Sequence, residues 1–164
     1  MAMWQHACIG LGSNLNNPIE QVRRALDELA AEPHCELVAH SQLYRSAPVG
    51  PQDQPDFINA VAVILTCLAP HDLLDRLQAL ETSHQRVRKR HWGERTLDLD
   101  LLLYGHAIIR TPRLTVPHPF MWERGFVVYP LSEVINHLEQ PQDYPLAECL
   151  NRIPFDLEAV ENDN

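Results

Sequence analysis

Long apolar segments are absent from this chain of 164 residues. The longest unbroken apolar run, at positions 60–65, is six residues long, whereas a membrane span needs about 20. Residues 1–14 contain no Lys or Arg, and Gln5 and His6 interrupt their short apolar stretch, so they do not look like an export signal. We therefore expect a soluble cytoplasmic protein.

Two nucleotide-binding motifs are also missing. Residues 10–15 read GLGSNL and lack the third glycine of a dinucleotide fingerprint, and no Gly-x-x-x-x-Gly-Lys-Ser/Thr loop occurs in the chain. The four cysteines, at positions 8, 35, 67 and 149, lack the close spacing of a metal site or redox pair. Rossmann and P-loop folds are therefore disfavoured, and we expect the cysteines to be buried apolar side chains.

Basic residues are scarce over most of the chain. Thirteen Lys and Arg oppose 22 Asp and Glu, for a net charge of −9, yet residues 86–95 contain five of these cations and one Glu. That segment carries +4, so the remaining residues carry −13. An acidic chain argues against a nucleic-acid or anionic-membrane binder, and its one basic segment predicts a small anionic ligand.

The composition, with 45% apolar and 21% charged residues, is typical of a globular protein, and the length predicts one domain over residues 1–164 with a disordered acidic tail. Periodicity predicts strands at 6–11, 36–45, 56–67 and 96–104, helices from Pro18 (capped by Asn17) to Pro33 and over 70–83, a small hairpin at 107–115, and weaker helices at 126–138 and 146–150. This order predicts a ferredoxin-like α+β fold, in which helices pack on a mostly antiparallel sheet in αβα layers.

An acid pair stands out in the last of these strands. Asp98 and Asp100 are two residues apart, so a strand places both carboxylates on one face, with Leu97, Leu99, Leu101 and Leu103 on the other. Carboxylate oxygens suit Mg²⁺, which takes one or two of them and leaves its other positions to water and phosphate. The alternative is an edge strand that simply turns its acids toward solvent.

Arginines surround this pair. Twelve of the 13 cations are Arg, whose planar guanidinium suits phosphate oxygens, and several lie near the acids in sequence: Arg86, Arg88, Arg95, Arg113 and Arg124. A transferring phosphoryl group needs cations and metal together. A solvated basic loop remains the alternative.

Other side chains fit a planar heterocyclic ligand or a phosphate. Phe57 and Asn59 share one face of their strand and offer a ring and an amide edge. Trp92 could cover a ligand, and His118 could donate to a phosphate or bind metal. Structural roles are the alternatives, namely core packing for Phe57 and Trp92 and a rigid turn for His118.

Five blocks in order resemble the 6-hydroxymethyl-7,8-dihydropterin pyrophosphokinase family over nearly the whole chain: 12–14, 50–60, 86–88, 92–100 and 113–119. The resemblance implies a ferredoxin-like α+β fold and an ATP-dependent transferase of folate biosynthesis. Such an enzyme passes pyrophosphate from ATP to the hydroxymethyl group of the dihydropterin and releases AMP.

The resemblance also implies roles for individual residues. Asp98 and Asp100 would bind two Mg²⁺ ions, and Arg86 and Arg95 would be catalytic. ATP would be bound by Gln78, Glu81, Arg88, Leu101, Arg113, Thr115, His118 and Arg124. The pterin would be bound by Ser46, Ala47, Val49, Phe57, Asn59, Trp92 and Phe126. Ser46-Ala47 stands where many members have Thr-Pro, and Phe57 where Tyr is frequent.

Two other functions compete with this interpretation. A metal-dependent hydrolase built on Asp98, Asp100 and His118 would cleave ATP without a pterin. An RNA-binding module would need aromatic and basic residues interleaved on the sheet, whereas this sheet carries paired acids. We expect small-molecule substrates, no nucleic acid or membrane partner, and a monomer.

Overall fold

The computed structural model describes residues 3–48, 50–84, 96–138 and 144–160. Its main sheet is antiparallel in every pairing, with strand order β5-β1-β4-β3-β8, and β2 also pairs with β4. These strands are β1 (Gln5–Ser13), β2 (Cys35–His40), β3 (Tyr44–Ser46), β4 (Phe57–Thr66), β5 (Asp98–Tyr104) and β8 (Glu158–Ala159). A separate hairpin joins β6 (Ile109–Arg110) to β7 (Thr115–Val116).

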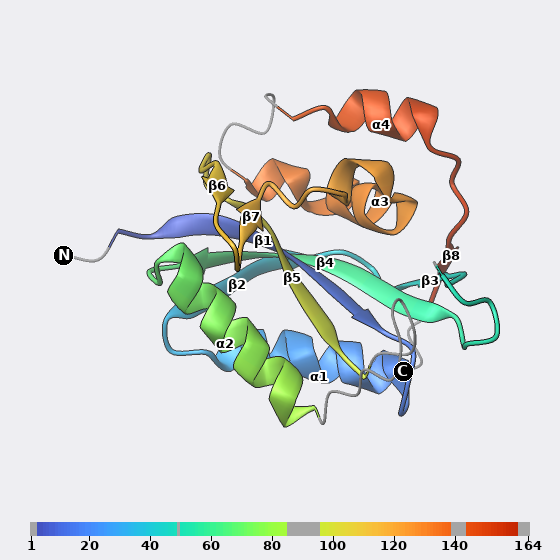
Figure 1. The fold of residues 1–164 in the computed structure, drawn as a ribbon, viewed down its shortest axis with the longest axis horizontal. Coiled ribbons are helices and arrows are strands. Elements are labelled where there is room, and N and C mark those ends of the chain that lie inside the picture. Colours follow the sequence, from blue (N-terminus) through green and yellow to red (C-terminus); the bar gives the residue numbers. More distant parts are fainter. Residues whose placement is uncertain (1–2, 49, 85–95, 139–143, 161–164) are drawn as a thin grey trace.

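Helices cover both faces of this sheet (Figure 1). On one face lie α1 (Pro18–Ala31) and α2 (Pro70–Ser83), which each begin with a proline at the first turn. On the other lie α3 (Gly125–Val134) and α4 (Leu146–Arg152), with two short 3-10 turns, η1 (Met121–Glu123) and η2 (Ile135–His137). The predicted ferredoxin-like α+β fold with αβα layers is confirmed.

The core has two parts, one on each face of the sheet. The larger part lies under α1 and α2 and takes alternate residues of the central strands, including Ala7, Ile9, Leu11, Ile58 and Ala60. The smaller part lies under α3 and takes Cys8, Val61, Val63, Leu102 and Leu103, among others. Cys8, Cys35 and Cys149 are buried and all four cysteines are free, as the sequence predicts, although Cys67 is only half-buried.

The prediction of one continuous strand at 36–45 is wrong, because the structure divides this segment into β2 and β3. Ser41 lies between them: its backbone N–H donates to Val61 O at 2.8 Å, while its hydroxyl accepts the Val61 N–H at 3.0 Å. A side-chain oxygen thus replaces a backbone carbonyl in the ladder. A register shift between Leu37 and Ala39 also moves Ala39 to the α3 face, although period two predicts that it shares a face with Leu37.

A second register shift changes the predicted faces of β5. Cys8 pairs with Leu103 and Ile9 pairs with Leu101, so Leu102 is an extra residue in the ladder. Leu97, Leu99 and Leu101 lie in the α1/α2 core as predicted, but Leu103 lies in the α3 core, so its predicted face is wrong.

Two further details differ from the sequence interpretation. Asn17 occupies the N-cap position of α1 but has a left-handed backbone (φ 62°) and makes no capping hydrogen bond with its side chain. The strand β8 has no counterpart among the predicted elements, because its two residues form a strand only by pairing with β3. The predicted acidic tail, residues 161–164, lies outside the described residues.

Candidate active site

The acid pair lies on the α3 face of β5. Leu99, between the two acids, points into the α1/α2 core, so Asp98 and Asp100 both face the opposite side, as period two predicts. Asp98 is half-buried and Asp100 is exposed, which leaves both carboxylates accessible to solvent.

Two glycines of β1 lie directly opposite these acids. Gly12 pairs with Asp98, and Gly10 pairs with Asp100. On its other side Gly12 pairs with Asn59 of β4, so Asp98, Gly12 and Asn59 form one row across three strands. A Cβ added at Gly12 would lie 3.2 Å from Asn59 Oδ1. The backbones of Asp98 and Asn59 are therefore roughly 10 Å apart, and Gly12 places no side chain between them.

The amide of Asn59 is fixed by its neighbour in β3. Asn59 Nδ2 donates to Ser46 Oγ at 2.7 Å, and both side chains are buried. This contact leaves Asn59 Oδ1 directed toward Gly12. Phe57 lies on the same face of β4 as Asn59, because the intervening Ile58 belongs to the opposite core. The structure thus brings together three of the residues predicted to bind pterin.

The loop that precedes Phe57 is organised by buried and partly buried amides. Asn14 Nδ2 donates to Gln54 Oε1 at 3.0 Å and to Pro55 O at 2.9 Å. Gln52 Nε2 donates to Pro48 O and to Gly50 O, at 2.8 and 3.0 Å. Asn14, directly after β1, therefore connects the end of that strand to the loop that follows Ser46 and Ala47, and Ala47 itself is exposed.

Glu81 approaches the acid strand from α2. Its side chain is buried, and its Oε2 accepts the backbone N–H of Leu99 at 2.9 Å. This contact anchors the backbone of β5 between the two acids. Leu101, predicted to lie near the adenosine, has its side chain buried in the α1/α2 core, so only its backbone could face a ligand.

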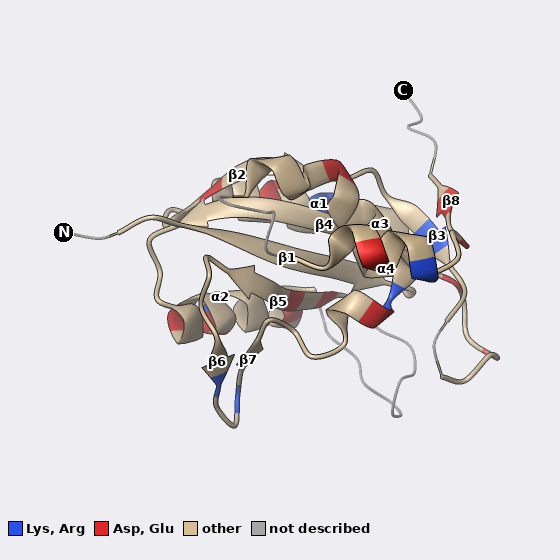
Figure 2. Cartoon of the chain, turned by 90° about the horizontal axis from the view of Figure 1, so that it is seen from above, with Lys and Arg blue, Asp and Glu red and all other residues tan. Residues whose placement is uncertain are grey.

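Two predicted ATP-binding residues meet at the edge of α2. Arg113, in the turn between β6 and β7, donates to Gln78 Oε1 at 3.2 Å. The same guanidinium nitrogen donates to Asp75 Oδ1 at 2.6 Å. Figure 2 shows basic residues, in blue, on the β6–β7 hairpin. Sequence reasoning missed Asp75, although it precedes Gln78 by three residues and therefore lies on the same helix face. Thr115 is exposed on β7, beside this hairpin turn.

A second cation is placed by aromatic rings at the entrance to α3. The Arg124 guanidinium carbon lies 5.3 Å from the Phe120 ring centroid and 5.6 Å from that of Phe126. Such contacts fix an arginine without neutralising its charge. Phe120 is half-exposed and was also missed in the sequence interpretation.

His118 lies beside this cation in its neutral form. Burial, and then the Arg124 charge, lower the pKa of His118 from 6.5 to about 4. The Phe120 N–H donates to His118 Nδ1 at 3.3 Å, which assigns the proton to Nε2. The His118 N–H donates to Leu102 O at 2.9 Å, so the histidine is attached to the acid strand. Its Nε2–H remains a suitable donor for an anion.

Five predicted site residues lie outside the described residues: Val49, Arg86, Arg88, Trp92 and Arg95. Within the described ranges no three His, Cys, Asp or Glu side chains cluster as a metal cage would require. None of the described helices is long and apolar enough to cross a membrane.

The fold and site together define a class of protein. It has αβα layers, a solvent-accessible acid pair with arginines nearby, and a glycine beside the acids that leaves the sheet open next to the Asn59 amide. Comparison with known proteins makes the class specific. The family model for 7,8-dihydro-6-hydroxymethylpterin-pyrophosphokinase matches residues 8–136, and the chain belongs to this family.

Two relatives with high sequence identity match this chain over most of their length. The chain is 51% identical to the 2-amino-4-hydroxy-6-hydroxymethyldihydropteridine pyrophosphokinase of Haemophilus influenzae, over 89% of this chain and 91% of that one. It is 50% identical to the protein of the same name from Pseudomonas aeruginosa, over 94% and 95% of the two chains.

A solved structure shows the same fold at low identity. A crystal structure of Plasmodium falciparum HPPK-DHPS matches with a TM-score of 0.70 and 12% identity. The match covers 92% of this chain but 43% of the other, so the chain spans less than half of that longer polypeptide.

Proposed function

We propose that this protein transfers pyrophosphate from ATP to the hydroxymethyl group of 6-hydroxymethyl-7,8-dihydropterin. The pterin hydroxyl oxygen attacks the β-phosphorus of ATP and forms a new P–O bond. The bond from that phosphorus to the α–β bridging oxygen breaks, AMP leaves with this oxygen and the bonding electron pair, and the hydroxyl proton passes to solvent. The products are the pterin diphosphate and AMP. This reaction is the one for which the family is named, and it is a step of folate biosynthesis.

The row Asp98–Gly12–Asn59 is the observation that carries this proposal. It supports the proposal because Asp98, Gly12 and Asn59 are paired in one row: the carboxylate would serve the phosphate end of the reaction, and the amide would bind the heterocycle. A pterin has a mixed donor and acceptor edge, which Asn59 can match with Oδ1 while Ser46 orients its NH₂ group. Phe57 and Phe126 would contact the faces of the ring, and Ala47 and Val49 would border it.

The residues present fit Mg²⁺. Two carboxylates without a third acidic ligand in the described ranges match an ion that takes one or two carboxylates and completes its shell with water and phosphate. Asp98 and Asp100 would bind two Mg²⁺ ions, which would neutralise charge on the ATP phosphates.

The cations would provide the remaining charge stabilisation. The phosphates would be contacted by Arg113, Thr115, His118 and Arg124. The rest of the nucleotide would lie beside Gln78 and Glu81 of α2 and the backbone of Leu101. His118 would donate from its neutral imidazole, because its pKa of about 4 keeps it uncharged at physiological pH. The family resemblance supports a catalytic role for Arg86 and Arg95, with Arg88 beside them and Trp92 over the pterin.

The assembly and location of the enzyme are part of the same proposal. We expect a monomer in the cytoplasm, with small-molecule substrates only. Size-exclusion chromatography with light scattering checks the monomer, and a stable dimer would contradict it.

Chromatographic detection of AMP tests the reaction. AMP should form from MgATP only when hydroxymethyldihydropterin is present, and in equal amount to the pterin diphosphate. AMP or inorganic phosphate released without pterin would support a metal-dependent hydrolase instead.

A further inference from the structure

The segment that follows α4 crosses two elements of the proposed pterin site. Residues 153–160, here called the C-terminal strap, run from the end of α4 past α3 and onto the outer edge of β3 (Figure 1). The two elements are α3, which contributes Phe126, and β3, which contributes Ser46. The strap contacts each of them close to that residue.

The first contact is at the start of α3, next to Phe126. A Cβ added at Gly125 would lie 3.3 Å from Ile153 Cγ2 and 3.7 Å from Pro154 O, so the strap packs directly on this turn. One turn further along α3, the Tyr129 hydroxyl donates to the carbonyl oxygens of Leu150 and Ile153. These contacts fix the strap on α3.

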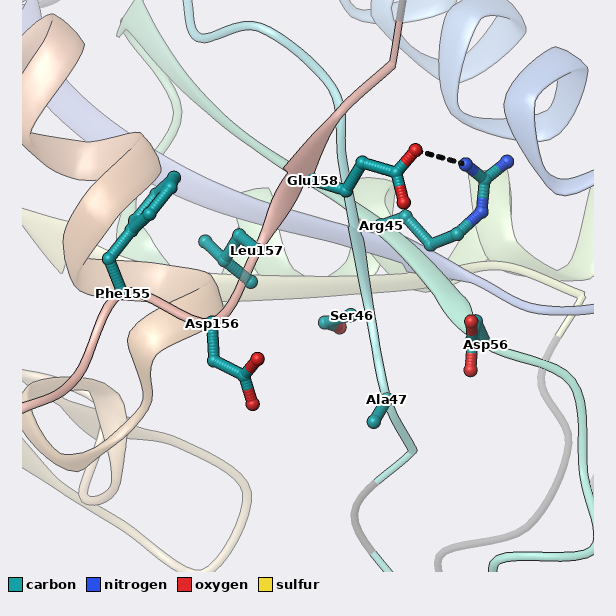
Figure 3. A pocket seen from close by; sticks show the side chains of 8 residues that line it. All are labelled: Arg45, Ser46, Ala47, Asp56, Phe155, Asp156, Leu157 and Glu158. Atoms are coloured by element: carbon teal, nitrogen blue, oxygen red, sulfur yellow. Dashed lines mark ion pairs between the residues drawn. The ribbon is translucent and has the colours of Figure 1, made fainter.

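The second contact is along β3, next to Ser46. The strand β8 pairs Glu158 with Arg45 and Ala159 with Tyr44, and the Val160 N–H donates to Leu43 O at 2.8 Å. Arg45 Nη1 also lies 4.0 Å from Glu158 Oε1. Figure 3 shows this part of the strap beside β3, with Ser46 and then Ala47 following Arg45 along the chain.

One side chain of the strap joins the two contacts. The Phe155 ring meets Tyr129 of α3 edge to face, with centroids 4.9 Å apart, and Tyr44 of β3, with centroids 6.4 Å apart. Tyr44 in turn donates its hydroxyl to Glu133 of α3. Phe155 is 59% exposed, so its ring makes these two aromatic contacts at the surface and not in the core.

We propose that the strap sets the distance between the two walls of the pterin pocket, and that Phe155 is a positioning residue for pterin binding. One wall is Phe126 at the start of α3, and the other is Ser46 with its partner Asn59. Strap residues 155–158 line a pocket of about 250 Å³ together with Ser46, Ala47 and Asp56, so the strap borders the wall that carries Ser46. The inference rests on the proposed function, because it requires that these walls bind pterin.

Steady-state kinetics of Phe155→Ala test the proposal in the full-length enzyme. Edge-to-face aromatic pairs contribute about 0.5–1.5 kcal/mol, so we expect the KM for hydroxymethyldihydropterin to rise about 2- to 12-fold. The KM for ATP should change by a smaller factor, because Arg113 and Gln78 are held by the β6–β7 hairpin and α2, and not by α3 or β3. Tyr129→Phe keeps the ring but removes the hydroxyl contacts with Ile153 of the strap and Leu150 of α4, and it should raise the pterin KM by a smaller factor.

Two controls separate positioning from general destabilisation. Phe155→Leu retains apolar contact and should recover part of the pterin affinity. Ile108→Ala truncates a side chain that is 76% exposed in another loop and should change neither KM. Equal changes in both KM values, or a pterin KM that stays at the wild-type value in Phe155→Ala and Tyr129→Phe, would overturn the proposal. Failure of the proposed function would appear earlier, as wild-type enzyme that forms no pterin-dependent AMP.

Discussion

The two faces of the main sheet use the same strands in opposite ways. Toward α1 and α2, β1 presents Ala7, Ile9 and Leu11 to a continuous apolar core. Toward α3, the same strand presents Cys8 to a smaller core and then Gly10 and Gly12 to the acids and Asn59. The buried Leu102 of β5 covers Gly10, so the apolar packing of this face ends at Gly12, beside Asn59 Oδ1. The polar strip that remains can receive a ligand while the other face stabilises the fold.

Asp98→Asn should remove the chemistry of the site face without unfolding the protein. The amide keeps the shape but loses the negative charge that a metal requires, so we expect kcat to fall at least about 100-fold. The half-buried position predicts little change in the thermal midpoint. Pterin-dependent AMP formation and thermal unfolding check both expectations.

The matched control for this change is Glu36→Gln, which removes one negative charge from the exposed side of β2. It should leave turnover unchanged. An equal loss of activity in both variants would mean that net charge, and not the acid pair, controls the reaction.

Ile9→Ala should have the reverse effect, because it truncates a fully buried side chain of the opposite face. Loss of such a side chain costs about 2–5 kcal/mol of unfolding free energy. Urea unfolding measures this loss, and the protein that remains folded should keep the wild-type KM for pterin. A raised pterin KM at unchanged stability would show that the two faces are not separate.

Gly12→Ala tests the bare strip itself. The new methyl group would lie 3.2 Å from Asn59 Oδ1 and would occupy the space assigned to the pterin edge. One misplaced methyl group in a binding pocket changes discrimination by about 10-fold or more, so the pterin KM should rise by this factor while the ATP KM stays constant.

Gly10→Ala is the natural comparison, because its Cβ would lie 3.4 Å from Cδ1 of the buried Leu102, an ordinary van der Waals contact. Its pterin KM should remain near that of the wild type. If both alanine variants bind pterin normally, the strip is not the pterin site.

The smallest effect should come from His118, whose partly exposed ring is screened by solvent. The pKa of His118 is about 4 in the folded protein and 6.5 in the unfolded chain. As pH falls below 6.5, the unfolded chain therefore binds a proton at this residue before the folded protein does. This histidine therefore lowers stability progressively as pH falls from 6.5 to 4 and has no such effect above pH 6.5.

His118→Asn keeps an acceptor for the Phe120 N–H and removes the titrating group. Urea unfolding from pH 7.5 to pH 4 should show a flatter decline in the variant than in the wild type. Identical slopes would contradict the lowered pKa of His118.

Much of the fold could be predicted because it follows local rules. The prolines at the first turns of α1 and α2, the Val- and Ile-rich strand β4 and the alternation around Asp98 each depend on neighbouring residues only. The errors occur where period two is interrupted. The register shifts that move Ala39 and Leu103 to the α3 face depend on the partner strands, and no signal in their own segments reveals them.

The site shows the same division. Family motifs identify Asp98, Asn59, Arg113 and Arg124 as candidates, but not what fixes each of them. Asn59 is oriented by Ser46, which is 13 residues away, and Arg113 is bound by Asp75, which is 38 residues away. Such partners meet only after the sheet and α2 have assembled.

The sequence alone therefore determined the kind of chemistry: which residues are acidic, which are cationic, and which strand presents the acids on one face. That information is local, because alternation and residue type require no knowledge of the rest of the chain. The tertiary structure decided how these groups are placed. It set Gly12 between Asp98 and Asn59, kept His118 neutral by burial beside Arg124, and joined β3 to α3 through Phe155. Strand register and burial arise from contacts between distant segments, so only the folded chain fixes them.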